Sequence, residues 1–522
     1  MIPLQCRYRQ LHKFMNCTGA LDNTVSRKPS MLTRTPERTL TEQLADRFAE
    51  RIRSRLLPVG ARLPSVRECA RQQGVSTHTV VAAYDQLLAQ GLVEARRQRG
   101  FFVRDAGQRS PAAVAGAPAG SPPGGTAAPG TPAAGAAILG AAALPMSGSH
   151  INATTLIRGM FHQASSKPQP GAGVFPPGWL EDARFMFAAV RRVTAGRALQ
   201  DGSLVYGEPR GDAGLRAALA RRLADLSVPA EPAQIITTIG ATHALDIVSR
   251  TLLKAGDPVM VEEPGWSVEF ARLDALGMRV LPVPRGPEGP DLDVMARYCE
   301  AHAPKLFVSV SVLHNPTGYS LSPGHAHRIL QLSHRHGFHI VEDDTYGHIA
   351  PDHATRLSAL DGLRRTIYVN GFAKILAPNW RVGYLAAPEG LVERLLDTKL
   401  LSTLTTPSIL EKALAQCIEQ GQLLRHAERM RLRLAQARAR SVQIALEAGQ
   451  RFAAEPAGMF GWVETGVDTD MLAQRMLDEG YLIAPGALFH ATRRPCTLMR
   501  INFTTTQDPG FWKVFQRAAR GL

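Results

Sequence analysis

Residues 367–385 read IYVNGFAKILAPNWRVGYL. The apolar, β-branched run at 367–370 predicts a buried strand, and a second apolar run at 382–386 predicts another. Lys374 stands between them on a short loop. A lysine in such a place is costly unless it is paired, neutral or used covalently. A lowered pKa would make it a nucleophile towards carbonyls. Alone, the pattern also fits a lysine that snorkels at a sheet edge.

The sequence on both sides of this stretch alternates strands with helices. That alternation predicts an α/β fold with a large, mainly parallel sheet covered on both faces. Ligands of such sheets bind outside the carboxyl ends of the strands. From Pro407 onward, long arginine-rich helices and two apolar segments predict a smaller αβ subdomain. The predicted strands of the large sheet are 234–238, 258–261, 279–283, 306–311, 339–341, 366–370 and 382–386.

Residues able to bind a ligand or take part in catalysis follow the predicted strands one after another. A helix that opens at a glycine offers free amide groups to an anion such as phosphate, and a tryptophan, an asparagine, carboxylates, a tyrosine and the lysine follow at later strand ends. One ligand, pyridoxal 5′-phosphate, uses all of these groups, and a carboxylate beside its ring nitrogen makes the ring an electron sink. Singly, Asn-Pro-Thr-Gly also fits a turn and Glu-Asp-Asp a metal site or solvated loop end. The residues are Gly240, Ala241, Thr242, Trp266, Asn315, Asp343, Tyr346, Lys374 and Arg381.

A separate module precedes this fold. Thr39 with Glu42 and Ser65 with Glu68 predict capped helix starts, and Ser76 predicts a third. Two short helices joined at Gly74 predict a helix-turn-helix. Short strands at 92–95 and 101–103 then flank an arginine-rich tip, which comprises Arg96, Arg97, Gln98, Arg99 and Gly100.

This module predicts binding to double-stranded operator DNA. The third helix would enter the major groove with Thr77, His78 and Thr79 facing base edges, and the tip would form a wing beside phosphates or in the minor groove. A helical docking module with a solvated arginine turn is the alternative that shape alone leaves open. The amino-acid sequence of residues 63–70, 74–87 and 91–93 resembles that of the GntR winged-helix family. The DNA-facing set predicted from cap, wing and resemblance is Ser65, Arg67, Ser76, Thr77, His78, Thr79, Arg96, Arg97, Arg99 and Gly100.

The module departs from that family at two points. Relatives usually have arginine where Thr77 stands, and their wing is usually rich in glycine. We therefore expect DNA binding with an operator sequence that differs from those of relatives.

Composition divides the chain into four parts. Residues 110–157 carry no Asp, Glu, Lys or Arg and are dominated by alanine, glycine and proline, which predicts a linker. A flexible chain of that length spans about 35–42 Å, about one turn of DNA between half-sites. We expect a disordered tail (1–35), a winged helix (36–105), the linker (106–160) and a ligand-binding and dimerisation domain (161–522).

The charge and cysteine content indicate the kind of partner and the cellular compartment to expect. The formal net charge is +15, which favours a polyanionic partner. The six cysteines form no metal-spaced pair, so neither a metal site nor a disulfide framework is expected. No apolar run is long enough for a membrane span, and the amino terminus lacks a signal-peptide core. These features predict a cytoplasmic protein without a membrane partner.

The motifs from Ala172 onward resemble the fold-type I aminotransferases, and with the winged helix the chain resembles a MocR-type regulator of the GntR family. The resemblance makes Lys374 the Schiff-base lysine, Asp343 the partner of the pyridinium nitrogen, and Asn315 and Tyr346 the partners of the phenolic oxygen. It implies ring stacking on Trp266 and a phosphate site at Gly240, Ala241, Thr242 and Arg381. It also implies that Tyr206 reaches the phosphate of a neighbouring subunit, hence a homodimer, and that Arg500 clamps a substrate carboxylate.

The departures from this family fall on the phosphate site. Relatives often have Ser-Gln where Ala241-Thr242 stand, and a serine where Gly371 stands. Fewer hydroxyl groups predict a weaker hold on the phosphate. The lysine, aspartate, tyrosine and arginines are present, so binding is still expected.

Three functions remain open at this stage. The first is a regulator that senses an amino acid or amine when that compound displaces Lys374 and forms an external aldimine. The second is a working aminotransferase with a DNA-binding appendage, since its catalytic set is complete on paper. The third is a cofactor-free scaffold, which gives Lys374, Asp343 and Arg500 no shared reason to exist.

Overall fold

The amino-terminal module follows the caps predicted from its sequence. The computed structural model describes residues 39–53, 56–96, 99–104, 167–196 and 205–521; the predicted tail and linker and Arg97 lie outside these ranges. Thr39 and Glu42 form a reciprocal cap. Ser65 and Ser76 each accept a backbone N–H at the start of their helices, and Gly74 ends α2 in the left-handed region. The helices are α1 (Leu40–Arg53), α2 (Val66–Gln73) and α3 (Thr77–Ala89).

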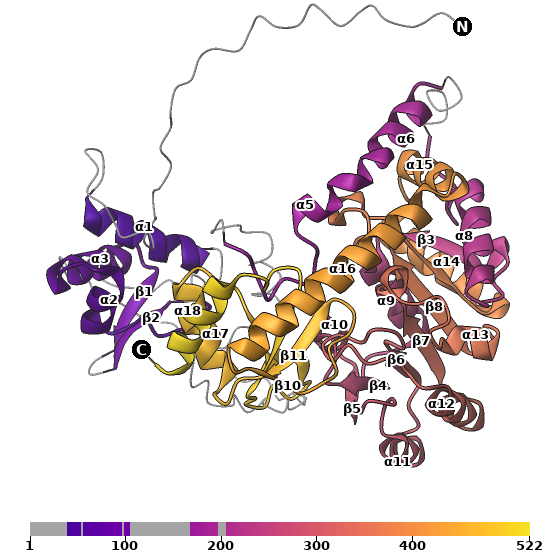
Figure 1. The fold of residues 1–522 in the computed structure, drawn as a ribbon. Coiled ribbons are helices and arrows are strands. Elements are labelled where there is room, and N and C mark those ends of the chain that lie inside the picture. Colours follow the sequence, from indigo (N-terminus) through magenta and orange to yellow (C-terminus); the bar gives the residue numbers. More distant parts are fainter. Residues whose placement is uncertain (1–38, 54–55, 97–98, 105–166, 197–204, 522) are drawn as a thin grey trace, which may run out of the picture.

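A two-stranded sheet completes this module (Figure 1). Strands β1 (Val93–Arg96) and β2 (Gly100–Val103) pair antiparallel, and Phe101 packs edge-on against Tyr84 of α3. The sequence placed Arg96 and Gly100 in the tip, but they are the last pair of the ladder. The tip is therefore one residue shorter at each end, because the backbone keeps pairing as far as Gly100.

The large domain is a seven-stranded sheet in the order β3-β9-β8-β7-β6-β4-β5. Five strands are parallel neighbours, and β9 runs antiparallel to both β3 and β8. The predicted α/β fold with a mainly parallel sheet is confirmed, and the antiparallel strand β9 makes the sheet mixed. The strands are β3 (Ile235–Thr238), β4 (Pro258–Glu263), β5 (Arg279–Pro284), β6 (Leu306–Ser309), β7 (His339–Asp343), β8 (Thr366–Gly371) and β9 (Gly383–Ala386).

Helices cover both faces of this sheet, because alternate side chains of each strand point to opposite faces. On β8, Ile367 and Val369 pack with α9 and α14, whereas Tyr368 packs with α8 and α15. The covering elements are α6 (Phe185–Thr194), α8 (Ala213–Asp225), α9 (Ala241–Leu252), α10 (Ser267–Ala275), α11 (Leu292–His302), α12 (Pro323–His336), α13 (Leu357–Asp361), α14 (Glu389–Thr403) and α15 (Ser408–Glu419).

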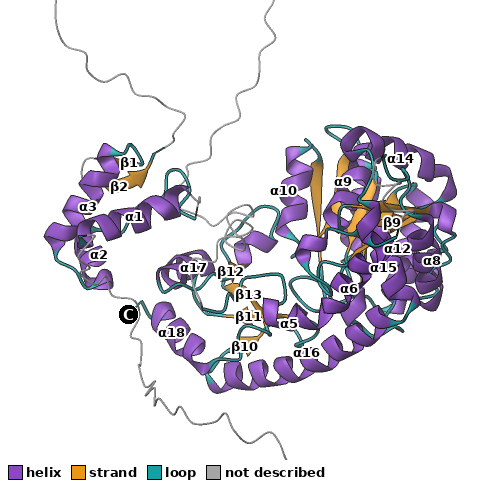
Figure 2. Ribbon diagram, turned by 90° about the horizontal axis from the view of Figure 1, so that it is seen from above, coloured by secondary structure: helices purple, strands orange, loops and turns teal. Residues whose placement is uncertain are grey.

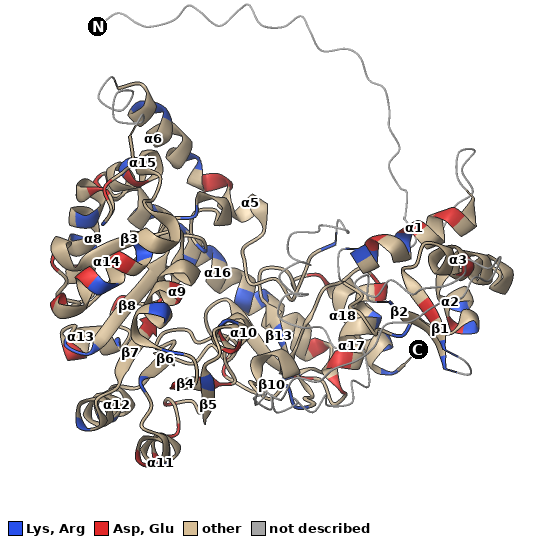
Figure 3. Cartoon of the chain, turned by 180° about the vertical axis from the view of Figure 1, so that it is seen from behind, with Lys and Arg blue, Asp and Glu red and all other residues tan. Residues whose placement is uncertain are grey.

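The long helix α16 (Gln422–Glu447) leads from the large domain to the predicted smaller subdomain, as Figures 1 and 2 show. A four-stranded antiparallel sheet in the order β10-β11-β13-β12 forms its centre. Basic and acidic residues are mixed over both parts (Figure 3). The elements are β10 (Arg451–Phe452), β11 (Phe460–Glu464), α17 (Thr469–Asp478), β12 (Ala484–Pro485), β13 (Leu498–Asn502) and α18 (Pro509–Ala519).

Short helical segments complete the connections. None of the helices in the part of the chain that the structure describes is long and apolar enough to cross a membrane. The short segments are α5 (Pro177–Leu180), η1 (Glu181–Arg184), η2 (Pro232–Gln234), η3 (Gly347–Ile349), η4 (Pro378–Trp380) and η5 (Gly486–Phe489).

Close packing of β9 against the start of α9 generates a prediction about stability. A Cβ at Gly383 would lie 2.5 Å from the backbone carbon of Gly240, whereas one at Gly390 would meet nothing within 4 Å. We expect Gly383→Ala to lower the free energy of unfolding by about 1–3 kcal/mol. Gly390→Ala is the matched control and should not lower it. Equal denaturation midpoints for both variants in guanidinium would contradict the close packing.

Candidate functional site

Lys374 lies on the loop after β8, largely enclosed by protein. Its Nζ donates to the carbonyl of Gly173 at 2.5 Å and lies 5.7 Å from the ring centre of Tyr346. Burial lowers the pKa of Lys374 to about 8, and the positive charges of Arg500 and Arg381 act in the same direction. The share of neutral amine near neutral pH is therefore far larger than in an ordinary lysine, and neutral amine is the form that attacks a carbonyl.

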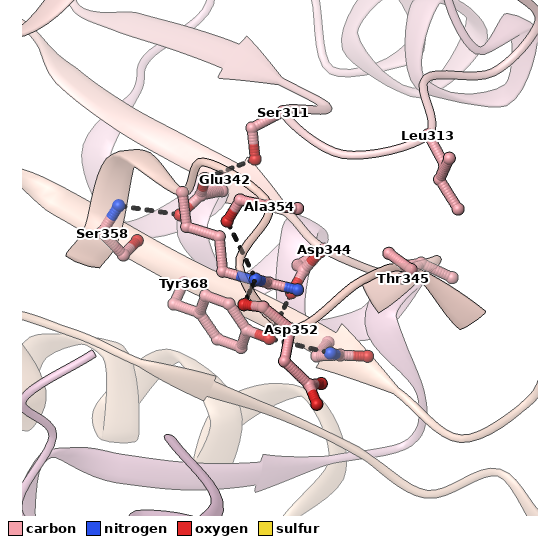
Figure 4. Close-up of polar contacts among 12 residues, drawn as sticks. Ser311, Leu313, Glu342, Asp344, Thr345, Asp352, Ala354, Ser358 and Tyr368 are labelled. Atoms are coloured by element: carbon pink, nitrogen blue, oxygen red, sulfur yellow. Dashed lines mark hydrogen bonds and ion pairs between the residues drawn. The ribbon is translucent and has the colours of Figure 1, made fainter. Parts of the chain in front are cut away.

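Three consecutive carboxylates at the end of β7 have three different surroundings, and Figure 4 shows those of Glu342 and Asp344. Glu342 accepts the backbone N–H groups of Leu357 at 2.7 Å and Ser358 at 2.8 Å, so it fixes the start of α13. Asp344 accepts Arg356 Nε at 2.8 Å and the Tyr368 hydroxyl at 2.7 Å. Both carboxylates are therefore committed to holding the strand end in place.

Asp343, between them, points the other way. One oxygen accepts the backbone N–H and the hydroxyl of Thr345. The side chain lines a cavity together with Trp266, Val261 and His314. Burial raises the pKa of Asp343 to about 6, so the carboxylate lacks a cationic partner strong enough to offset desolvation. A protonated ring nitrogen beside Asp343 would supply one.

Arg500, on β13 of the small subdomain, faces the same site. Its guanidinium lies between the rings of Phe460 and Phe489, with its central carbon 4.4 and 5.1 Å from their centres. Nη1 donates to Asn315 Oδ1 at 3.0 Å, and Asn315 also hydrogen-bonds Tyr346. Burial lowers the pKa of Arg500 to about 10. Its Nε is buried without a partner among the described residues.

The start of α9 provides an anion site. Gly240 is the N-cap residue at φ +82°, without a side-chain cap, so the positive end of the helix is open to a ligand. Arg381 reaches across it, donating from Nη2 to the carbonyl of Ile239 at 2.8 Å. Thr242 is exposed in the first turn, and Ala241 lies beneath it.

The departure at Gly371 has a structural counterpart. A Cβ there would lie 3.1 Å from the backbone nitrogen of Ala241. The missing side chain lets the end of β8 approach the amide groups of α9 directly. A backbone contact therefore stands where relatives place a hydroxyl group.

Most of the predicted cofactor and substrate residues therefore converge on one edge of the sheet. Lys374, Asn315, Tyr346 and Arg500 are linked by direct contacts, Asp343 shares its cavity with Trp266, and Gly240 is packed by Arg381. Tyr206 is the exception: it is 77% exposed in the single chain and joins none of these contacts.

The predicted DNA-facing residues divide into exposed and committed side chains. Arg67, Thr77, His78 and Arg99 are exposed, and Gly100 begins β2. Ser65 is engaged as a helix cap. The hydroxyl groups of Ser76 and Thr79 lie 2.8 Å apart in the cap of α3, and Arg96 is paired with Glu94 at 2.7 Å.

Two features of these sites were not predicted from sequence. Arg62 bridges to Phe102 and its side chain lies 3.4 Å from the Cβ position of Gly100, so it adds a cation to the wing. Residues 171–174 pass over Lys374 and Arg500 with backbone carbonyls alone. The clustered glycines at 171 and 173 were a signal of close backbone approach.

Comparisons with known proteins agree with both parts of this architecture. Residues 180–509 match the aminotransferase class I and II family, and residues 40–103 match the bacterial regulatory proteins of the gntR family. The chain is 30% identical over 413 residues to a probable rhizopine catabolism regulatory protein, MocR, of Rhizobium meliloti, covering 77% of this chain and 76% of that protein.

Two further relatives differ in how much of the chain they share. An uncharacterized HTH-type transcriptional regulator of Escherichia coli, YdcR, is 27% identical over 88% of this chain and 94% of its own length. The crystal structure of LysN, the α-aminoadipate aminotransferase of Thermus thermophilus, complexed with N-(5′-phosphopyridoxyl)-L-leucine, superposes with a TM-score of 0.63. That match has 25% identity and covers 70% of this chain and 94% of LysN. The solved enzyme therefore lacks a counterpart to the rest of this chain.

The lowered pKa of Lys374 predicts the pH dependence of its reaction with an aldehyde. The attacking species is the neutral amine, so the rate should rise with pH and reach half its maximum near pH 8, instead of about 10.4 for an ordinary lysine. Arg500→Gln removes a positive charge, so the pKa should rise and the midpoint should move to higher pH. Stopped-flow absorbance with pyridoxal 5′-phosphate measures both; a midpoint near pH 10 in the unaltered protein contradicts the assignment.

Proposed function

The chain belongs to the aminotransferase class I and II family and to the MocR type of gntR regulator, and from this premise we propose that it is a pyridoxal 5′-phosphate-dependent transcriptional regulator. The observation that carries the proposal is the convergence of Lys374, Asp343 and Arg500 at one edge of the sheet. The winged helix in the same chain gives that site a readout on DNA. A cytoplasmic location, where DNA is accessible, fits this function.

The residues present suit the cofactor. The raised pKa of Asp343 and its place in the cavity beside Trp266 fit a carboxylate that awaits a ring N–H. The open start of α9 with Arg381 fits a phosphate, and Asn315 with Tyr346 fits a phenolic oxygen. When bound, the cofactor supplies an aldehyde that condenses with amines and a ring that withdraws electrons.

The effector that this site fits is an amino acid or a related amine. Arg500 offers two parallel donors to a carboxylate, and its aromatic neighbours restrict it to one plane. In the cofactor-loaded protein Lys374 would hold the cofactor aldehyde and would be released when an incoming amine takes its place. Displacement of one lysine and pairing of one arginine are enough for sensing.

Dimerisation by two-fold symmetry completes the proposal. Tyr206 is 77% exposed and Val205 71% exposed in the single chain, which fits a segment that packs against a second copy. A symmetric dimer presents two winged helices to paired operator half-sites.

The second candidate is an aminotransferase that happens to carry a DNA-binding module. Enzymes of this fold need a base that removes the proton from the substrate α-carbon, and Lys374 with its lowered pKa is able to do that. The long region between the winged helix and the large domain favours the regulator, since metabolism alone gives it no role.

A paired assay separates the two functions. We expect binding of one class of amino compound to change operator affinity, with turnover far below the enzyme range of about 1–1000 per second. Arg500→Ala should keep cofactor and operator binding but lose the response to the effector. The measurement combines pyridoxamine-phosphate accumulation across the amino acids with fluorescence anisotropy on operator DNA. Rapid turnover with a keto-acid acceptor, and an operator affinity indifferent to every amino compound, would favour the enzyme.

The exposed arginines of the winged helix should bind phosphates without reading sequence. Removing Arg67 or Arg99 should weaken binding to all duplexes and reduce the slope of log affinity against log salt by about one unit. Arg96, which is paired with Glu94, should have the smaller effect of the three arginines. A salt series with unchanged slopes would show that these side chains do not contact DNA.

A further inference from the structure

Residues 167–174, here called the strap, cross the ligand site with their backbone. Arg500 Nη2 donates to the Gly171 carbonyl at 2.5 Å, and Lys374 Nζ donates to the Gly173 carbonyl at 2.5 Å. Asn502 adds side-chain bonds to the carbonyls of Ala172 at 3.1 Å and Val174 at 2.9 Å. Both cations that a ligand would use are therefore engaged by the strap.

The strap is also hydrogen-bonded to residues 478–483, here called the turn. The turn begins at the last residue of α17 and continues into the loop after it. Lys167 Nζ donates to the carbonyl of Glu479 at 2.6 Å. Gln169 accepts the N–H of Leu482 at 2.7 Å, and Gly171 N–H donates to the carbonyl of Leu482 at 2.7 Å. The strap and the turn are thus joined at three positions along their length.

The approach of strap and turn is close enough to require glycine. A Cβ at Gly171 would lie 2.5 Å from the backbone carbon of Ile483 and 2.8 Å from the nitrogen of Ala484. Since both of these neighbours are backbone atoms, neither can rotate away. A displacement of the strap must therefore displace the backbone of the turn as well.

The other end of the turn touches the DNA-binding module. Arg51 Nη1 lies 2.9 Å from Asp478 Oδ1, and the two side chains are only 14% and 18% exposed. Arg51 belongs to the last turn of α1, and Figures 1 and 2 both show α1 beside α17. Asp478 and Glu479 make this corner acidic, which complements Arg47 and Arg51 of α1.

We propose that this acidic corner is the docking surface for α1 of the DNA-binding module, and that the strap ties the dock to the ligand site. In the cofactor-loaded protein Lys374 would be condensed with the aldehyde, so the bond from Arg500 to Gly171 is the charge-assisted bond that holds the strap, and a ligand carboxylate takes that donor. The strap then loses this bond, and its hold on the turn and on Asp478 weakens. The inference rests on the proposed function. It adds the contacts through which ligand binding at Lys374 and Arg500 changes the docking of α1.

This connection has the two features that coupling requires. It has two arrangements that differ in a defined contact, with the strap either bonded to Arg500 or released from it. A ligand that binds only the released arrangement shifts the balance by its differential affinity. The effect is reciprocal, so weakening the dock must also loosen the strap.

Reciprocity gives a test that needs no knowledge of the effector. In the full chain with pyridoxal 5′-phosphate, Arg51→Glu or Asp478→Arg should raise amide exchange in peptides covering 167–174 and 478–483 about fivefold, the size expected for one ion pair. The double variant R51E/D478R restores the pair with its charges swapped and should restore slow exchange. Peptides from β6–β8 report whether each variant is folded.

The matched control breaks a comparable ion pair far from the strap. Arg221 and Glu419 lie 3.2 Å apart on the surface, with side chains 63% and 51% exposed. Arg221→Glu should leave exchange in the strap and turn unchanged. Strap exchange unaltered in both single variants, or a double variant that fails to restore it, overturns the proposal.

A second experiment adds either of two small molecules at the ligand site and measures the effect on α1. Aminooxyacetate captures the cofactor aldehyde and carries a carboxylate for Arg500, whereas methoxyamine captures the aldehyde alone. Aminooxyacetate should raise amide exchange in α1 residues 40–53, methoxyamine, which brings no carboxylate to Arg500, should leave it unchanged, and Arg51→Glu should abolish the response to aminooxyacetate. Gly171→Ala, which wedges the strap from the turn, should mimic the ligand, whereas Gly178→Ala has open space and should not.

The two levels of the account fail separately. Absence of the absorbance change on adding the probes means that no cofactor is held, which overturns the proposed function. A normal absorbance change with unaltered exchange in α1 leaves the cofactor site standing and overturns the strap as its route to the DNA-binding module.

Discussion

Two positive charges are buried side by side at one edge of the sheet, and the rest of the site depends on this constraint. Lys374 and Arg500 come from different domains, and burial lowers the pKa of each. Such charges are costly unless their donors are satisfied. Backbone carbonyls of Gly171 and Gly173 satisfy them here. A ligand with a carboxylate and a carbon electrophile competes with these carbonyls for the same donors.

The neighbouring carboxylates show how the sheet isolates one reactive group from two structural ones. Strand alternation directs Glu342 and Asp344 away from Asp343, and each finds strong donors of its own. Asp343 keeps a raised pKa because burial outweighs its bonds to Thr345. Three consecutive acids thus provide two carboxylates that hold the strand end and one, Asp343, that does not.

Much of this could be predicted from the sequence, for clear physical reasons. The caps at Thr39, Ser65 and Ser76 are local, so the winged helix followed from short motifs. Buried parallel strands read as apolar runs, so all seven strands were located within about two residues. The predicted cofactor residues lie at strand ends, and the parallel sheet brings those ends together at one edge.

The parts that sequence did not reveal depend on backbone and on distant contacts. The strap acts through carbonyl groups, which every residue has, so its sequence carries only the glycine signal. The pair of Arg51 with Asp478 joins residues far apart in the chain, and ordinary surface charges look the same in a sequence. The aromatic clamp on Arg500 required the register of β11 with β13. Tyr206 joins none of the contacts of the site within the single chain.

The central claim is that Lys374 is the residue that captures the cofactor, and the chain offers a natural competitor. Lys399 is also buried, and burial lowers its pKa to about 8. Its Nζ, however, donates to the carbonyl of Pro209 at 2.6 Å and lies 3.4 Å from the hydroxyl of Thr237 on β3. The direct measurement is borohydride reduction of the protein with pyridoxal 5′-phosphate, followed by peptide mass mapping. The account predicts reduced cofactor on Lys374 and none on Lys399. Label on Lys399, or no label on either lysine, would contradict it.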